Sequence, residues 1–179
     1  MWFKIEDNTI TETYSKPKAV LIGDIQYPQN IFNLWTESQL NDIGIYSLDS
    51  IDSTNRKDKK YYTNTNITYT FSGGKVTGSY GTPGAKNLND STDLDDNVVP
   101  GLKTQEKNIV DSTQHGLLVD SDWMAIRKSD TGEAIPTAWK TYRDSVRTKS
   151  DSFKTAIDAV STVDELADIT YDWPTPPTN

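Results

Sequence analysis

The chain has 179 residues, of which 34% are hydrophobic, and a formal net charge of -8. This length allows one domain with its own core, or two small domains. The absence of cysteine excludes disulfides and thiolate metal sites. The acidic balance argues against nucleic acid, which needs a basic patch to displace counterions, and no run reaches the roughly 18 apolar residues of a membrane span. We therefore expect neither a nucleic-acid nor a membrane partner.

Residues 1–80 have the pattern of a β-rich N-terminal domain with one short helix. Alternating stretches on both sides of Asp7-Asn8 predict a hairpin, because these two residue types tolerate the positive φ of a tight turn. Gly73-Gly74 separates two further β-rich stretches and predicts a second hairpin. Residues 36–39, Thr-Glu-Ser-Gln, have the spacing of a capping box and predict the start of the helix. We expect the strands to be antiparallel.

Residues 81–100 are rich in Gly, Pro, Asn and Asp, which predicts a linker. Residues 101–179 then predict a helical C-terminal domain. Its longest helix is expected to begin at Pro136, because proline is tolerated in the first turn of a helix. Thr162 begins a second capping box, which predicts a short final helix. The fold class is therefore α+β, with an antiparallel β-rich N-terminal region followed by a helical C-terminal region.

The helix from Pro136 to Val160 carries a stripe of large side chains at spacings of three and four. Its members are Trp139, Tyr142, Val146, Phe153 and Val160. A stripe of this kind can join copies of the chain into a homo-oligomer. It can also pack internally on the helix expected near Leu102, and Lys149, which interrupts the stripe, favours internal packing. Arg143 and Arg147 flank the stripe, and we expect them to be solvated, or to pair with Asp144, Asp151 or a partner carboxylate.

No catalytic, cofactor-binding or metal-binding constellation emerges from the sequence. The single histidine, His115, has no cysteine or second histidine beside which to bind a metal, and no nucleophile motif accompanies it. The acidic run at 90–96 lacks the glycine and the distal glutamate of an EF-hand loop. We therefore expect a protein that is not an enzyme and that requires no cofactor or metal.

Two parts of the chain resemble a known family. The first is the phrase at 27–46, from Tyr-Pro-Gln-Asn to Gly-Ile-Tyr, and the second is most of 116–177, including the Asp-Trp pair at 122–123 and the Trp-Pro-Thr-Pro-Pro ending. Lys75 and Val76 with their neighbours, and Ala-Lys-Asn-Leu at 85–88, add to the likeness. The chain resembles bacteriophage tail-fibre assembly proteins and small virion proteins of marine phages.

The resemblance implies a non-enzymatic tail or virion structural protein, made in the bacterial host cytoplasm, that binds a tail fibre or another virion subunit. Members of such families help fibre subunits to assemble or remain in the particle. The residues that we expect to contact a partner are aromatic and arginine side chains. They are Trp35, Trp123, Trp139, Tyr142, Arg143 and Arg147. A carbohydrate-binding module for host attachment, which uses exposed Trp and Tyr, is the alternative.

Overall fold

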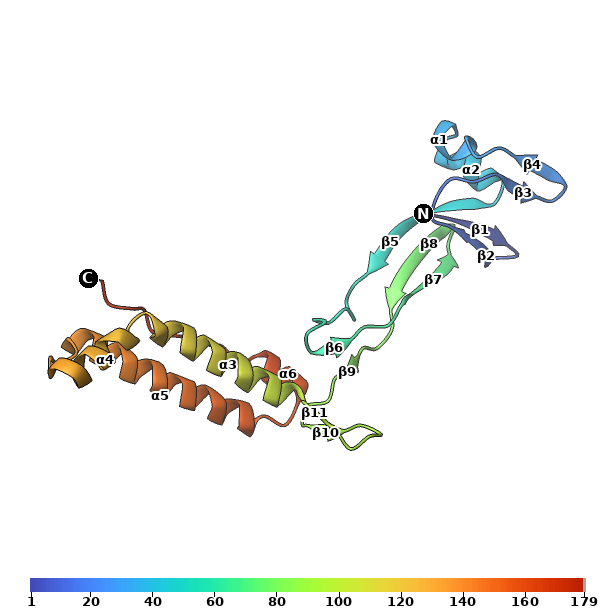
Figure 1. Cartoon of the computed structure of the whole chain (residues 1–179). Coiled ribbons are helices and arrows are strands. Elements are labelled where there is room, and N and C mark those ends of the chain that lie inside the picture. The colour runs from blue at the N-terminus through green and yellow to red at the C-terminus, as the bar shows by residue number, and fades with distance from the viewer. Residues whose placement is uncertain (179) are drawn as a thin grey trace. The chain divides into compact units, whose positions relative to one another are not determined.

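The computed structural model describes residues 1–178, and the chain forms two compact units (Figure 1). The first unit, Met1–Gly84, contains a β-sheet and two short helices, and the second unit begins at Ala85 and is mostly helical. The predicted α+β class, with strands before helices, is confirmed.

The main sheet of the first unit has five strands in the order β2-β1-β5-β8-β7. They are β1 (Trp2–Glu6), β2 (Thr9–Tyr14), β5 (Ile45–Asp52), β7 (Ile67–Ser72) and β8 (Lys75–Tyr80). Three of the pairings are antiparallel, as predicted, but β5 and β8 run parallel. The cause is topological: β8 lies between β5 and β7, so the returning strand of the β7–β8 hairpin has the direction of β5.

Both predicted hairpin turns form. Asp7 and Asn8 have φ values of 50° and 59°, and Gly73 and Gly74 have 59° and 76°. Positive φ at both central residues is the requirement of a turn whose twist matches that of the paired strands. The two turns fix the register of β1 with β2 and of β7 with β8.

The remaining elements of the first unit are short. They are β3 (Val20–Ile22), β4 (Ile25–Tyr27), α1 (Ile31–Leu34), α2 (Glu37–Asp42) and β6 (Tyr62–Thr63), which pairs with β9 (Gly84–Ala85). Thr36 caps α2 in the predicted capping box with Gln39. The two helices cover a buried cluster that they share with the sheet. Its members are Tyr14, Val20, Ile31, Phe32, Leu40 and Ile45.

The second unit is built on two long helices that pack along each other, α3 (Leu102–Val119) and α5 (Thr137–Ala159). They run antiparallel: Lys107 pairs with Asp158 at one end, and the Tyr142 hydroxyl donates to the Leu117 carbonyl at the other. Two shorter helices, α4 (Asp122–Thr131) and α6 (Val163–Ala167), complete the unit. Among residues 1–178, no helix is both long and apolar enough to cross a membrane.

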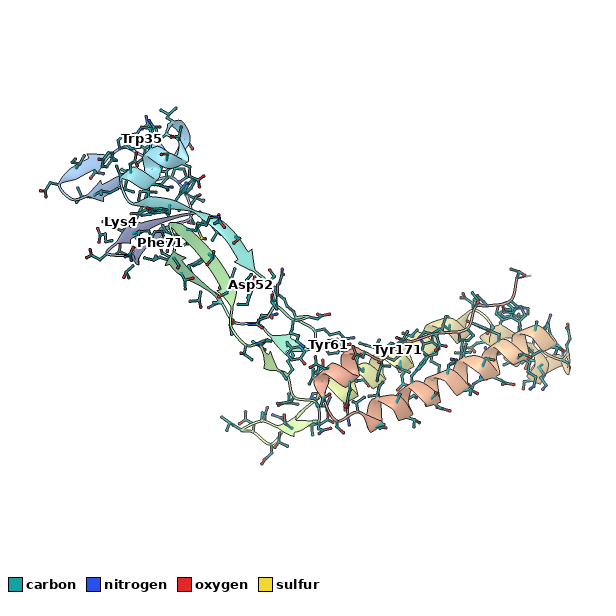
Figure 2. All side chains as sticks on the ribbon, turned by 180° about the vertical axis from the view of Figure 1, so that it is seen from behind. Lys4, Trp35, Asp52, Tyr61, Phe71 and Tyr171 are labelled. Carbon is teal, nitrogen blue, oxygen red and sulfur yellow. The ribbon has the colours of Figure 1, made fainter. Side chains whose placement is uncertain are left out.

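The stripe on α5 forms internal core. Tyr142, Val146 and Phe153 are all at most 5% exposed. The segment after α6 also packs on this helix, where the rings of Tyr171 and Trp173 meet Phe153 edge-on at 5.2 and 5.0 Å. Figure 2 shows Tyr171 on this segment beside the helices of the second unit. Internal packing, the outcome that the sequence favoured, is the one observed.

Much of the segment predicted as a linker belongs to the second unit, because the division falls between Gly84 and Ala85. Residues 91–99 form a hairpin of β10 (Ser91–Thr92) and β11 (Val98–Val99). The segment is tied to the start of α3, where the Gly101 amide donates to Asp90 at 2.7 Å and the Leu102 amide to the Asn87 carbonyl at 2.9 Å. These hydrogen bonds join residues distant in sequence, and composition alone does not predict them.

Candidate interaction sites

A pocket with many positive charges lies between α4 and α5 in the second unit. It has a volume of about 260 Å³, and we call it the cationic pocket. Its lining residues come from α4, from the loop that follows it and from the first half of α5. They are Ala125, Lys128, Ala134, Ile135, Lys140, Arg143, Asp144 and Arg147. Four cations and one carboxylate thus surround three apolar side chains, in a protein whose net charge is -8.

Arg143 is the buried member of the cationic pocket, with 8% of its side chain exposed. Its Nη1 donates to the Leu118 carbonyl at 3.1 Å and to the Ser121 hydroxyl at 2.6 Å, and its Nη2 donates to the Asp122 carboxylate at 2.8 Å. A guanidinium has a fixed planar array of donors, so these bonds lock its orientation. Arg143 therefore joins α5 to the turn between α3 and α4, and it is not the solvated surface residue that we expected.

The exposed cations give the cationic pocket a positive field. Asp144 accepts from Lys140 at 2.9 Å and lies 3.6 Å from Arg147. The hydrogen bond from Lys140, together with the charges of Lys140, Arg147 and Arg143, lowers the pKa of Asp144. Lys128 forms no ion pair with any residue between 1 and 178. Asp122 balances the charge of Arg143, and Asp144 balances one of the charges of Lys140 and Arg147. The remaining positive charge, including that of Lys128, allows the pocket to accept a further acidic group.

The predicted aromatic contact residues are placed in different environments. Tyr142 is buried, its hydroxyl donates to the Leu117 carbonyl, and burial raises its pKa. Trp139 is half-buried and meets Tyr142 edge-on at 5.8 Å. Trp123 on α4 is 50% exposed, with the Arg127 guanidinium 4.8 Å from its ring. Trp35 lies in the other unit, half-buried against Tyr27.

Arg143 and Arg147 are thus the two predicted site residues that line one pocket. Sequence reasoning missed Lys128 and Lys140. Lys140, Asp144 and Arg147 lie at helical spacings of four and three, which is a readable signal for one face of α5. No such signal exists for Lys128, because the packing of α4 on α5 brings it to the same place.

The first unit has its own open groove, of about 760 Å³, at the end of the sheet where three turns meet. We call it the turn groove. Its lining includes the two hairpin turns at 7–8 and 72–74, together with Gly44. Tyr46 and Phe71 form its aromatic part, with ring centroids 4.7 Å apart, and Figure 2 shows Phe71 on the sheet of this unit. Aromatic faces beside an exposed Asp7 carboxylate suit a ligand with both apolar and hydroxyl-bearing surfaces.

Three comparisons, with protein families, with curated proteins and with solved structures, found no match to this chain. The two sites are therefore interpreted from their own chemistry. Within residues 1–178 no group of three or more His, Cys, Asp or Glu side chains is placed to hold a metal ion, and His115 is exposed. The cationic pocket can bind a carboxylate next to a small apolar side chain, and the turn groove can bind a ligand that stacks on a ring.

Proposed function

We propose that the chain is a non-enzymatic structural protein of a bacteriophage tail or virion, and that it binds a tail fibre or another virion subunit. The observation that carries this proposal is the cationic pocket. The resemblance of residues 27–46 and 116–177 to tail-fibre assembly and virion proteins supplies the biological setting.

The pocket has the features of a protein-binding site. Arg143 is pre-oriented by its hydrogen bonds, so little conformational entropy is lost when a ligand binds beside it. Ile135 and two alanines give the pocket an apolar part, and the exposed Lys128 and Arg147 supply positive charge. Exposed charges steer encounter and reject partners of the wrong charge, while contact with the apolar part gives affinity.

The direct test is mass spectrometry of particles purified from an infected culture, joined to a binding measurement with the product of the neighbouring reading frame. We expect the chain in the particles, and we expect Lys128→Glu with Arg147→Glu to weaken binding of the neighbour at least about tenfold. The matched control is Lys16→Glu with Arg56→Glu, which changes the net charge equally on exposed residues of the first unit. Absence from particles together with no binding would refute the proposal.

A carbohydrate-binding function is the second candidate, and the turn groove is the observation that favours it. Tyr46 and Phe71 offer ring faces, and the exposed Asp7 and Asn8 offer hydrogen-bonding groups for sugar hydroxyls. A glycan array separates this candidate from the first. Loss of a glycan signal on Phe71→Leu, with retention on Trp123→Leu in the other unit, supports the groove as a sugar site. An array without signal removes this candidate.

A further inference from the structure

The tip of the β10–β11 hairpin exposes an apolar side chain among carboxylates. Leu94 is fully exposed, with a relative accessibility of 104%. Asp95 and Asp96 follow it directly, and Val98 is 66% exposed. A lone exposed apolar side chain needs no explanation, but one at the end of a structured acidic hairpin has the form of a docking anchor.

Asp93 holds the tip in one conformation. One of its carboxylate oxygens accepts from the backbone amides of Asp95 and Asn97, both at 2.9 Å, and the other accepts from the Asn97 side chain at 3.2 Å. The backbone amide of Asp93 in turn donates to the Asn97 carbonyl at 3.0 Å. The tip is therefore ordered without a partner, so that presenting Leu94 costs little conformational entropy on binding.

The tip and the cationic pocket have complementary chemistry. The tip offers one apolar side chain and two carboxylates, while the pocket offers the apolar side chain of Ile135 and cations at Lys128 and Arg147. Its volume of about 260 Å³ accommodates a leucine side chain and leaves room for a carboxylate.

The two surfaces of one chain cannot meet each other. The hairpin is fastened to the first residues of α3 through Asp90 and Gly101, whereas the pocket lies at the far end of that helix, beside α4. Figure 1 shows β10 and β11 at one end of α3 and α4 at the other. The 18 residues of α3 span about 27 Å, at 1.5 Å of rise per residue.

We propose that the hairpin tip Leu94-Asp95-Asp96 of one copy docks in the cationic pocket of a second copy. This inference rests on the proposed function in one respect, that the pocket is a protein-binding site. Because the two surfaces differ, the contact is heterologous, and the resulting dimer keeps one free tip on one copy and one free pocket on the other. Repetition of such a contact closes into a ring or extends into a filament, which are forms that a structural subunit of a particle uses.

The test is the molar mass of the purified full chain, measured by light scattering over a wide range of concentration at low and at high salt. We expect the mass to rise with concentration and the association to weaken with salt, because exposed charges are screened. Two variants remove one surface each: Leu94→Ser with Asp95→Asn alters the tip, and Lys128→Glu with Arg147→Glu alters the pocket. Asp96 is left unchanged because its φ of 61° disfavours most other side chains.

Each variant alone should associate at least about tenfold more weakly than the natural chain. An equimolar mixture of the two should form dimers and nothing larger, because the pair retains one intact tip and one intact pocket. The control, Ile109→Ser with Asp151→Asn, makes the same chemical changes at exposed positions of α3 and α5 and should associate normally. Circular dichroism of each variant verifies that it is folded.

A natural chain that stays monomeric at every concentration overturns the inference, as does a tip variant that associates normally or a mixture that forms no dimer. These outcomes are separate from the test of the proposed function. A monomeric chain found in particles refutes only the docking of one copy on another. An oligomer absent from particles, whose pocket does not bind the neighbouring product, refutes only the virion role.

Discussion

Arg143 connects α5 to the turn that joins α3 and α4, and it does so from a position almost closed to solvent. A buried guanidinium is tolerated when it is hydrogen-bonded, and here the Leu118 carbonyl, the Ser121 hydroxyl and the Asp122 carboxylate accept three hydrogen bonds from Nη1 and Nη2. Asp122 remains half-exposed, so the ion pair keeps some solvent on its carboxylate side. The residue therefore contributes to stability chiefly through hydrogen bonds that span two helices.

Replacing Arg143 by methionine should lower the free energy of unfolding by about 1–3 kcal/mol, because it leaves the buried Ser121 hydroxyl and Leu118 carbonyl without their charged donor. Arg147→Met is the matched control. Arg147 is exposed and has only a 3.6 Å contact with Asp144, so its loss should cost less than about 0.5 kcal/mol. Urea unfolding of both variants measures the difference. Equal stabilities would show that Arg143 is not a structural tie.

The raised pKa of Tyr14 predicts that the protein loses stability at alkaline pH. Burial, reinforced by the negative charge of Glu12, raises the pKa of Tyr14 from 10.0 to about 12. The folded pKa lies above the unfolded one, so the stabilisation is fully present below pH 10 and is lost as the pH rises from 10 to about 12. Tyr14→Phe should flatten this part of the profile of stability against pH. An equally steep profile in the variant would show that another group titrates.

At the scale of the elements, local signals in the sequence predict the local structure well. The capping boxes at Thr36 and Thr162 and the turns at 7–8 and 73–74 all form. Each depends on side-chain and backbone preferences within a few residues, so the local sequence is enough to predict it. The stripe on α5 belongs to the same class, because helical spacing alone places its members on one face.

The elements that the sequence did not predict depend on contacts between distant residues. The parallel pairing of β5 with β8 arises because β8 lies between β5 and β7, and no local pattern encodes that order. The same applies to the cationic pocket, where Lys128 of α4 joins Lys140 of α5 only through tertiary packing. Expectations drawn from the sequence of α5 and its neighbours one segment at a time therefore omitted half of the cations that line the cationic pocket.

The burial of the α5 stripe predicts that truncating one of its large side chains destabilises the protein. Phe153 is 5% exposed and lies against the rings of Tyr171 and Trp173, so Phe153→Ala should cost about 3–5 kcal/mol and lower the melting temperature of the chain. Trp123→Ala, at a ring that is half-exposed, should cost no more than about 1 kcal/mol. Differential scanning calorimetry measures both. An unchanged melting temperature for Phe153→Ala would contradict its assignment to the core.

At the scale of the whole molecule, each unit has a hydrophobic cluster of its own. In the first unit the cluster includes Phe32, Leu40 and Ile45, and in the second it includes Leu118, Tyr142 and Val146. A unit that buries its own apolar surface meets the main requirement for folding alone. This division also places the turn groove and the cationic pocket on different units of the chain.

We therefore expect the fragments 1–84 and 85–179 to fold independently. Each should give a dispersed amide spectrum by NMR, and the two spectra together should reproduce most peaks of the full chain, because each fragment keeps its own cluster. Fragments cut at 100 instead of 84 provide the control. That cut separates Asn87 and Asp90 from Leu102 and Gly101, so the helical fragment should lose stability by about 0.5–1.5 kcal/mol for each hydrogen bond removed. If the helical fragment is equally stable whether it begins at 85 or at 101, residues 85–100 are not part of the second unit. The hairpin at 91–99 would then lack the rigid support that its presentation of Leu94 to a second copy requires.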